Sequence, residues 1–213
     1  FQGSKGKKAC AECGRGGYCP PGAAAMTLCA AGRYGEDAGQ TSAESCKPTP
    51  AGSASSPGAT AHTPCAAGTI APDIGYEACE PCEAGSYCAV GAAAALPCEA
   101  GSYSASAGAG SCDPCPAGSA CPTGSTGATL CGPGTFSTPA LGACIKCGAG
   151  TYQESEGASA CDACLAGHYC AEGASVAQPC EAGSWKELPH CLSGLSAWVD
   201  KLAGVLITEL MNW

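Results

Sequence analysis

The spacing of the cysteines constrains this chain more than any other feature. The pattern Cys-x2-Cys-x5-Cys-x9-Cys occurs four times without an insertion, and the four copies begin at Cys10, Cys79, Cys112 and Cys161. Related units begin at Cys46 and Cys144, so the full-length period is close to 33 residues. Because 21 of the 213 residues are cysteine, the chain has the composition of a scaffold closed by disulfides in an oxidising compartment.

The rest of the composition excludes a large hydrophobic core. The chain contains 32 glycines and 16 prolines, and only 6% of its residues are aromatic. Glycine and proline interrupt the sequence every few residues, which favours turns and short hairpins over long helices or strands. We therefore predict a small disulfide-rich fold: an elongated tandem array of cysteine-rich modules of about 33 residues, with short irregular β-hairpins and little helix.

A glycine motif accompanies the cysteines. A glycine stands three residues after most cysteines and is often followed by a small residue and then an aromatic, as in Gly85-Ser86-Tyr87 and Gly101-Ser102-Tyr103. This position suits a backbone with positive φ or a close approach of two backbone segments. We expect the aromatic rings to pack over the disulfides, and we expect the histidines His62, His168 and His190 to lie on the surface.

One degenerate copy of the repeat predicts how the cysteines pair. Residues 46–65 align without gaps on residues 112–131, but Thr49 and Ser55 replace the equivalents of Cys115 and Cys121. Loss of one partner alone would leave a stray thiol, so the joint replacement indicates that Cys115 and Cys121 are bonded to each other. The other cysteines then pair consecutively along the chain. The predicted disulfides are Cys13–Cys19, Cys29–Cys46, Cys65–Cys79, Cys82–Cys88, Cys98–Cys112, Cys115–Cys121, Cys131–Cys144, Cys147–Cys161, Cys164–Cys170 and Cys180–Cys191. Cys10 is left unpaired, and we expect its partner to lie upstream of Phe1.

The spacing Cys144-x2-Cys147-x13-Cys161-x2-Cys164 also resembles a zinc site with four thiolates. The other copies give no consistent set of four ligands, and the degenerate copy loses a Cys-x5-Cys pair rather than a Cys-x2-Cys pair. We therefore favour disulfides and predict no metal and no cofactor. The sequence shows no catalytic motif such as a nucleophile elbow or a phosphate-binding glycine loop, so we predict that the protein is not an enzyme.

Charge narrows the choice of partners. The net charge is −9, and no lysine or arginine occurs between Lys47 and Lys146. Because this acidic stretch repels phosphate groups and anionic lipid, we predict no nucleic-acid partner. No apolar run is long enough to span a membrane, and the predicted partners are other proteins of the cell surface or matrix, or copies of this chain.

The cysteine pattern gives the predicted domain organisation. It consists of a tail (1–9), a first repeat (10–46), a second repeat lacking one disulfide (46–79), two full repeats (79–112 and 112–144), a shortened repeat (144–161), a fifth repeat (161–191) and an apolar C-terminal helix (192–213). The segment 47–64 is rich in Ser, Thr and Pro, and we interpret it as a flexible joint that is a candidate for O-linked sugar.

The combined Cys-x-x-Gly-[Ser/Thr]-Tyr and Cys-x2-Cys pattern between Cys10 and Cys191 resembles ephrin-receptor-like cysteine-rich repeats, which are similar to the modules of tumour-necrosis-factor receptors. The resemblance implies an extracellular or cell-surface location and repeats without catalysis. Our leading interpretation is a structural and interaction rod within a large surface or matrix protein. A ligand-binding receptor ectodomain and the subunit of an extracellular filament are the alternatives.

Overall fold

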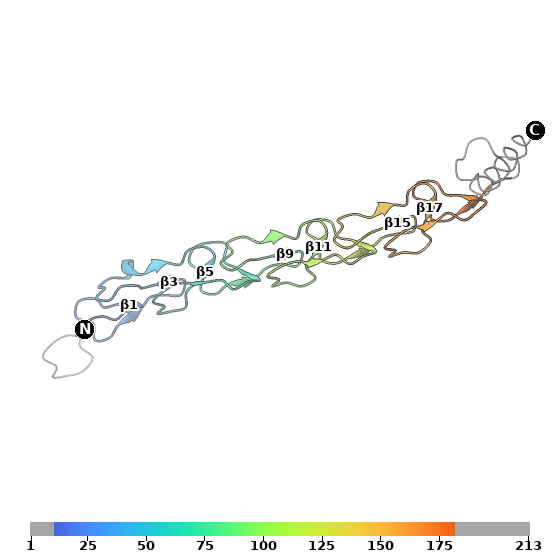
Figure 1. Ribbon diagram of the computed structural model, residues 1–213. Helices are drawn as coiled ribbons and strands as arrows, with labels where there is room; N and C mark the ends of the chain where they lie inside the picture. Colours follow the sequence, from blue (N-terminus) through green and yellow to red (C-terminus); the bar gives the residue numbers. More distant parts are fainter. Residues whose placement is uncertain (1–10, 182–213) are drawn as a thin grey trace, which may run out of the picture. The chain divides into compact units, whose positions relative to one another are not determined.

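The computed structural model describes residues 11–181 as ten antiparallel hairpins that follow one another in chain order (Figure 1). Each hairpin consists of two strands of two residues. The hairpins, from first to tenth, are β1 (Gly17–Tyr18) with β2 (Thr27–Leu28), β3 (Arg33–Tyr34) with β4 (Lys47–Pro48), β5 (Ser53–Ala54) with β6 (Thr63–Pro64), β7 (Thr69–Ile70) with β8 (Glu80–Pro81), β9 (Ser86–Tyr87) with β10 (Leu96–Pro97), β11 (Ser102–Tyr103) with β12 (Asp113–Pro114), β13 (Ser119–Ala120) with β14 (Thr129–Leu130), β15 (Thr135–Phe136) with β16 (Ile145–Lys146), β17 (Thr151–Tyr152) with β18 (Asp162–Ala163), and β19 (His168–Tyr169) with β20 (Gln178–Pro179).

A 3-10 helix, η1 (Ala43–Ser45), lies in the connection of the second hairpin. None of the helices within residues 11–181 is long and apolar enough to cross a membrane. The predicted C-terminal helix (192–213) and the predicted N-terminal tail (1–9) lie outside the described residues. The prediction of short hairpins with little helix is confirmed for the part of the chain that is described.

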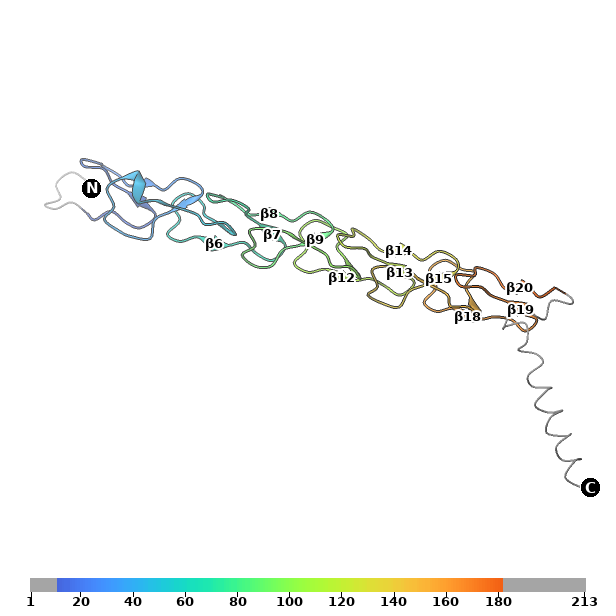
Figure 2. The ribbon, with the colours of Figure 1, turned by 90° about the horizontal axis from the view of Figure 1, so that it is seen from above.

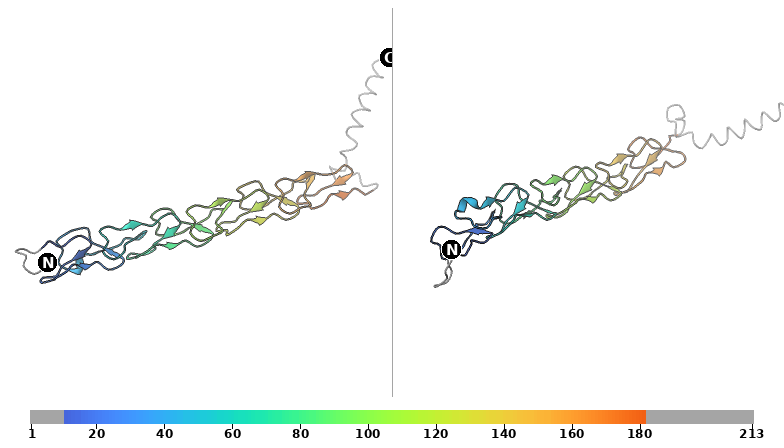
Figure 3. Two further views of the ribbon diagram at one scale, coloured as in Figure 1. Left: turned by 90° about the horizontal axis from the view of Figure 1, so that it is seen from below. Right: turned by 60° about the vertical axis from the view of Figure 1, so that its left-hand side comes forward.

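The described residues form two compact units. The first comprises residues 11–99, 103–113 and 123–127, and the second comprises residues 100–102, 114–122 and 128–181. The two strands of a hairpin pair with each other rather than join a larger sheet, as the separate pairs of arrows in Figures 2 and 3 illustrate. Since no layered sheet forms in the described residues, neither unit has an apolar interior of the usual kind.

The structural repeat is half as long as the cysteine period. β9 begins at Ser86, and β13, the first strand of the hairpin two places further along, begins at Ser119. One period of the cysteine pattern therefore contains two hairpins. β15 and β17 begin at Thr135 and Thr151, so the segment that the cysteine spacing marks as shortened contributes a hairpin of ordinary spacing. The longest step separates β3 from β5, because the connection between them holds η1.

Three backbone hydrogen bonds join each hairpin to the next within a unit. In two of these bonds the earlier hairpin donates the N–H group, and in the third the later hairpin donates it. In the second and third hairpins they run from Gly32 N–H to the carbonyl of Ser55 (2.8 Å), from Gly35 N–H to the carbonyl of Ala59 (2.9 Å) and from Gly58 N–H to the carbonyl of Cys29 (2.9 Å). The same three bonds recur between the eighth and ninth hairpins of the second unit. Successive hairpins are thus joined through backbone groups that are the same for any sequence.

We call the glycine that directly precedes each first strand the entry glycine. Every entry glycine has a positive φ, as the sequence motif predicts, and Gly118 before β13 is typical at +78°. A methyl carbon placed on Gly118 would lie 1.9 Å from the carbonyl oxygen of Gly157, in the connection of the ninth hairpin. Eight entry glycines from Gly16 to Gly134 make this approach, with corresponding distances of 1.9–2.4 Å. Each of these hairpins therefore touches the hairpin two places further along.

We call the residue on the other side of this contact the loop glycine, of which Gly157 is an example. Among the described residues, Ala140 is the one residue other than glycine with a positive φ, at 61°, and it occupies a loop-glycine position. It presents its carbonyl oxygen to Gly101 as the loop glycines do. The loop position therefore requires a left-handed backbone, whereas the entry position also requires the absence of a side chain.

Sulfur and backbone form most of the interior. Of the 16 buried apolar residues in the described part of the chain, 13 are cysteines, and the others are Tyr34, Ala71 and Ala120. The aromatic residues that follow the other entry glycines are half-buried, as Tyr87, Tyr103, Phe136 and Tyr152 show. The disulfides and close backbone contacts consequently replace a side-chain core.

Two glycine substitutions should separate the requirement for a left-handed backbone from the requirement for the absence of a side chain. Gly118→Ala and Gly124→Ala both place a side chain on a backbone with nearly the same positive φ, but only the first meets another atom within 4 Å. We expect Gly118→Ala to lower the free energy of unfolding by about 1 to 3 kcal/mol more than Gly124→Ala, because overpacking adds to the shared backbone penalty. Denaturant titration under non-reducing conditions measures both, and equal losses would contradict the proposed contact.

Candidate functional site

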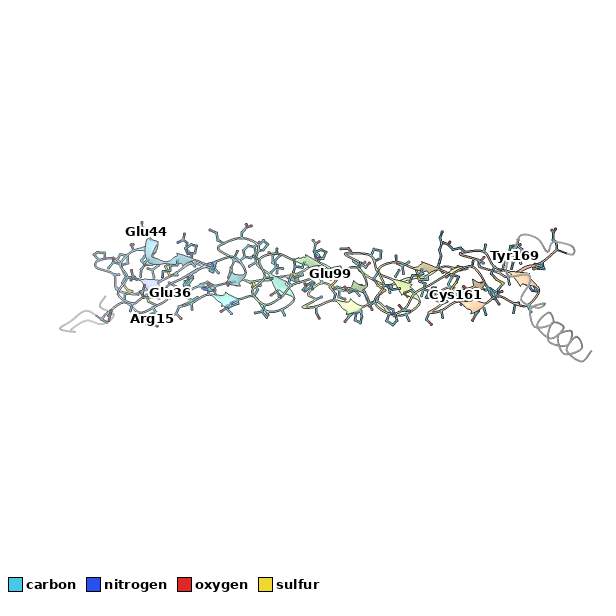
Figure 4. The ribbon with its side chains drawn as sticks, turned by 45° about the horizontal axis from the view of Figure 1, so that its top comes forward. Arg15, Glu36, Glu44, Glu99, Cys161 and Tyr169 are labelled. Carbon is cyan, nitrogen blue, oxygen red and sulfur yellow. A yellow bond between two sulfur atoms is a disulfide. The ribbon has the colours of Figure 1, made fainter. Side chains whose placement is uncertain are left out.

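The most extensive constellation of reactive groups in the chain is its set of cysteines, drawn with yellow sulfur bonds in Figure 4. The structure contains nine disulfides among the described residues, and they coincide with nine of the ten predicted pairs. They are Cys13–Cys19, Cys29–Cys46, Cys65–Cys79, Cys82–Cys88, Cys98–Cys112, Cys115–Cys121, Cys131–Cys144, Cys147–Cys161 and Cys164–Cys170. Cys180 is disulfide-bonded, while Cys191, its predicted partner, and Cys10 lie outside the described residues.

Two kinds of bridge close the hairpins. Short bridges join cysteines six residues apart, as in Cys82–Cys88, and long bridges join cysteines 13 to 17 residues apart, as in Cys98–Cys112. The two kinds alternate through most of the described chain, which explains why the cysteine period covers two hairpins. Each bridge closes a loop within one hairpin, so every cross-link among the described residues is local.

The cysteines with zinc-like spacing do not form one site. Cys144, Cys147 and Cys164 belong to three different disulfides, and Cys161 shares a bridge with Cys147. Within residues 11–181, no group of three or more His, Cys, Asp or Glu side chains is arranged to hold a metal ion. The zinc alternative of the sequence analysis is therefore not supported.

The third hairpin (β5–β6) is the exception among the ten, because no disulfide closes it. Thr49 and Ser55 occupy the positions at which the seventh hairpin has Cys115 and Cys121. Both are buried, with 0% of Thr49 and 3% of Ser55 exposed to solvent. Neither Thr49 Oγ1 nor Ser55 Oγ has a hydrogen-bond partner in the protein. The third hairpin therefore buries two hydroxyls at the positions where the seventh hairpin has a disulfide.

The same hairpin holds a third unpaired polar atom. The His62 ring packs against Tyr34 in an edge-on contact with ring centroids 5.3 Å apart, and His62 Nδ1 is buried without a hydrogen-bond partner. His62 is half-buried rather than fully exposed, because Tyr34 of the preceding hairpin covers part of its ring. The buried unpaired side-chain atoms found within residues 11–181 are thus all in the third hairpin.

Other hairpins satisfy the polar groups that replace a cysteine. Ser137 is fully buried in the eighth hairpin and donates its hydroxyl to the carbonyl of Ser119 (2.6 Å). In the ninth hairpin, Gln153 Nε2 donates to the carbonyl of Ala160 (3.0 Å) and its Oε1 accepts from Ser155 N–H (2.9 Å). Burial at this position is therefore general, and the missing hydrogen bonds are particular to the third hairpin.

A hollow of about 380 Å³ lies beside the second hairpin, where the longer connection holds η1. Arg33 Nη1 donates to the carbonyl of Cys46 (2.6 Å), which fixes the guanidinium at the wall. Leu28 is 52% exposed here, and Figure 4 labels Glu44 on this part of the chain. The lining residues are Tyr18, Leu28, Ala30, Arg33, Ala43, Glu44 and Cys46. The hollow offers a cation, a carboxylate and an apolar wall, which is the mixed chemistry of a protein-contact surface.

An exposed ion pair stands on the same hairpin. Lys47 Nζ donates a hydrogen bond to the Glu36 carboxylate, and this bond lowers the pKa of Glu36 and raises the pKa of Lys47. Glu36 therefore contributes stability that is present above its unfolded pKa and is lost as the pH falls through its folded pKa, whereas the contribution of Lys47 is lost as the pH rises through its folded pKa. Because both groups are exposed, the pair adds little to stability.

Comparison with known families finds a match within the second unit. Residues 134–180 match the family model described as "Tyrosine-protein kinase ephrin type A/B receptor-like". This part of the chain is an ephrin-receptor-like cysteine-rich segment. The match begins at the entry glycine of the eighth hairpin and ends at Cys180, so it covers three consecutive hairpins of the second unit. No curated protein matches the chain.

The family match, together with the nine disulfides, gives the chain the character of an extracellular interaction module. Modules of this type are receptor-like and non-catalytic, and both findings suggest an extracellular or cell-surface location. The disulfide-rich tandem repeats predicted from the sequence are confirmed.

The hydroxyls of Thr49 and Ser55 predict a gain in stability on replacement, and the hydrogen-bonded hydroxyl of Ser137 serves as a control with the opposite expected effect. Replacing them by apolar groups of similar shape in Thr49→Val/Ser55→Ala should raise the free energy of unfolding by about 1 to 3 kcal/mol, since each buried hydroxyl without a partner carries a desolvation penalty. Ser137→Ala removes a satisfied hydroxyl and should lower the same quantity by about 1 kcal/mol. Denaturant titration under non-reducing conditions tests both, and a loss of stability in the double variant would show that Thr49 and Ser55 are hydrogen-bonded.

Proposed function

We propose that this chain is a non-catalytic structural and interaction array within a large cell-surface or matrix protein. The observation that carries the proposal is the regular contact between hairpins. Within each unit, a hairpin donates backbone hydrogen bonds to the next hairpin and accepts one from it. Through its entry glycine it also touches the hairpin two places further along. Contacts at both spacings fix the position of each hairpin against its neighbours, which suits a protein whose task is to maintain a defined length.

The energetics of such an array suit an extracellular setting. Each disulfide closes a short loop, and closing a loop of about 15 residues contributes about 3 kcal/mol in the chain-entropy model. The bridges do not depend on a large apolar core, which small glycine- and alanine-rich modules lack. Stability is therefore distributed over many local hairpins and over the contacts between neighbouring hairpins.

We infer that protein partners bind the exposed side chains of the first unit. Six acidic residues lie between Lys47 and Lys146, and all of them are exposed and belong to the first unit. They are Asp73, Glu77, Glu80, Glu83, Glu99 and Asp113. They favour partners with basic surfaces and disfavour nucleic acid and anionic membranes. The hollow beside η1 supports the second candidate, a ligand-binding receptor ectodomain, because it combines Arg33 and Glu44 with an apolar wall.

The cysteine-based domain boundaries stay a proposal, with two hairpins in each full repeat. Within 47–64, the candidates for O-linked sugar reduce to Ser56, Thr60 and Thr63, which are exposed. Thr49, Ser53 and Ser55 are buried and have no access to a glycosyltransferase while the hairpin is closed.

Small-angle X-ray scattering of the full chain tests the structural role. A compact chain of 213 residues would have a radius of gyration of about 17 Å. We expect a value well above this, and we expect it to be unchanged by Arg33→Ala/Glu44→Ala, which alters the hollow without touching a disulfide. The same double variant should weaken capture of partners from extracellular material if the hollow binds them. A radius of gyration close to that of a compact chain would overturn the proposal of an extended array.

A further inference from the structure

We propose that the third hairpin (β5–β6) is the extensible element of the array, which opens under tension while every disulfide stays intact. The source of the tension rests on the proposed structural role, but the capacity to open does not. It follows from the covalent topology of the described residues and from the packing of the third hairpin.

The covalent topology limits how much chain each hairpin can release. A stretch enclosed by a disulfide cannot extend, so only the stretches between bridges contribute. A short bridge is followed by a free stretch of intermediate length, such as the one from Cys88 to Cys98. The consecutive bridges Cys147–Cys161 and Cys164–Cys170 leave only β18 between them. The stretch from Cys46 to Cys65 is the longest between two of the nine bridges, and it holds the whole third hairpin.

The same hairpin also resists opening least. Its backbone bonds to the second and fourth hairpins follow the common register, including Gly52 N–H to the carbonyl of Ala71 (2.8 Å) and Ser55 N–H to the carbonyl of Tyr76 (3.0 Å). The third hairpin therefore differs from the other hairpins in its missing disulfide and its missing side-chain hydrogen bonds, not in its backbone contacts. No cross-link closes it, and burial of Thr49 Oγ1, Ser55 Oγ and His62 Nδ1 without partners opposes its closed state.

Opening has a defined length. At an extended length of about 3.3–3.6 Å per residue, the stretch from Cys46 to Cys65 provides a contour of about 65 Å, against about 35 Å for a stretch such as Cys88 to Cys98. Opening of the hairpin exposes the buried hydroxyls to solvent and breaks the contact of the entry glycine Gly52 with Gly91. Because the flanking bridges Cys29–Cys46 and Cys65–Cys79 remain closed, the hairpin can re-form when tension falls.

Single-molecule force spectroscopy on the full chain, tethered at its two ends without reductant, tests this proposal. The wild type should show one release step of up to about 65 Å, the contour length less the folded distance between Cys46 and Cys65, at a lower force than the steps of up to about 35 Å. Thr49→Cys/Ser55→Cys, after air oxidation and a mass check for the loss of two hydrogens, divides the stretch into the segments 46–49 and 55–65 and should abolish the long step. Thr49→Val/Ser55→Ala is the matched control, because it should raise the force of the long step without changing its length.

Two results would overturn the proposal. One is a long step that is absent, or that occurs at a higher force than the shorter steps. The other is a long step that persists in the oxidised cysteine variant. Limited proteolysis without reductant provides a second measurement, in which we expect the first cut between Cys46 and Cys65 and its suppression in the same variant; a first cut elsewhere in residues 11–181 contradicts the proposal. A compact scattering profile together with the long step would refute the structural role while leaving the extensible hairpin standing.

Discussion

The structure depends on disulfides that join cysteines close to each other in the sequence. Each of the nine bridges within residues 11–181 joins cysteines at most 17 residues apart, so it fixes one hairpin without reference to distant segments. Once the cysteine pairs are closed, the intervening residues have few conformations left, and two-residue strands suffice to complete each hairpin. A conventional core would need large apolar side chains at the positions that glycine, alanine and serine occupy in this chain.

Glycine provides the second constraint, because it allows the stapled hairpins to stack closely. The approach of Gly118 to the carbonyl of Gly157 shows why: a single added methyl carbon would collide with the backbone two hairpins away. The hydrogen bonds between successive hairpins and this contact use backbone atoms, so the outward side chains are free to vary. The acidic stretch of the first unit and the hollow beside η1 are therefore properties added to a scaffold that does not depend on them.

The sequence predicts the bridges well, because their pairing follows from local spacing and from the joint loss of two cysteines at Thr49 and Ser55. It predicts the positive φ of the entry glycines for the same local reason. It does not predict the single hairpin as the structural unit, since the alternation of short and long bridges doubles the visible period. The contact of His62 with Tyr34 and the contact between Gly118 and Gly157 depend on neighbouring hairpins and have no local signal.

Mapping the disulfides by mass spectrometry of the unreduced, protease-digested protein tests the central claim most directly. Local closure predicts peptides that link Cys98 to Cys112 and Cys115 to Cys121, with no cross-link between them. A peptide that links Cys112 to Cys121, or Cys98 to Cys115, would contradict this account, because bridges that cross from one hairpin to the next cannot close each hairpin separately.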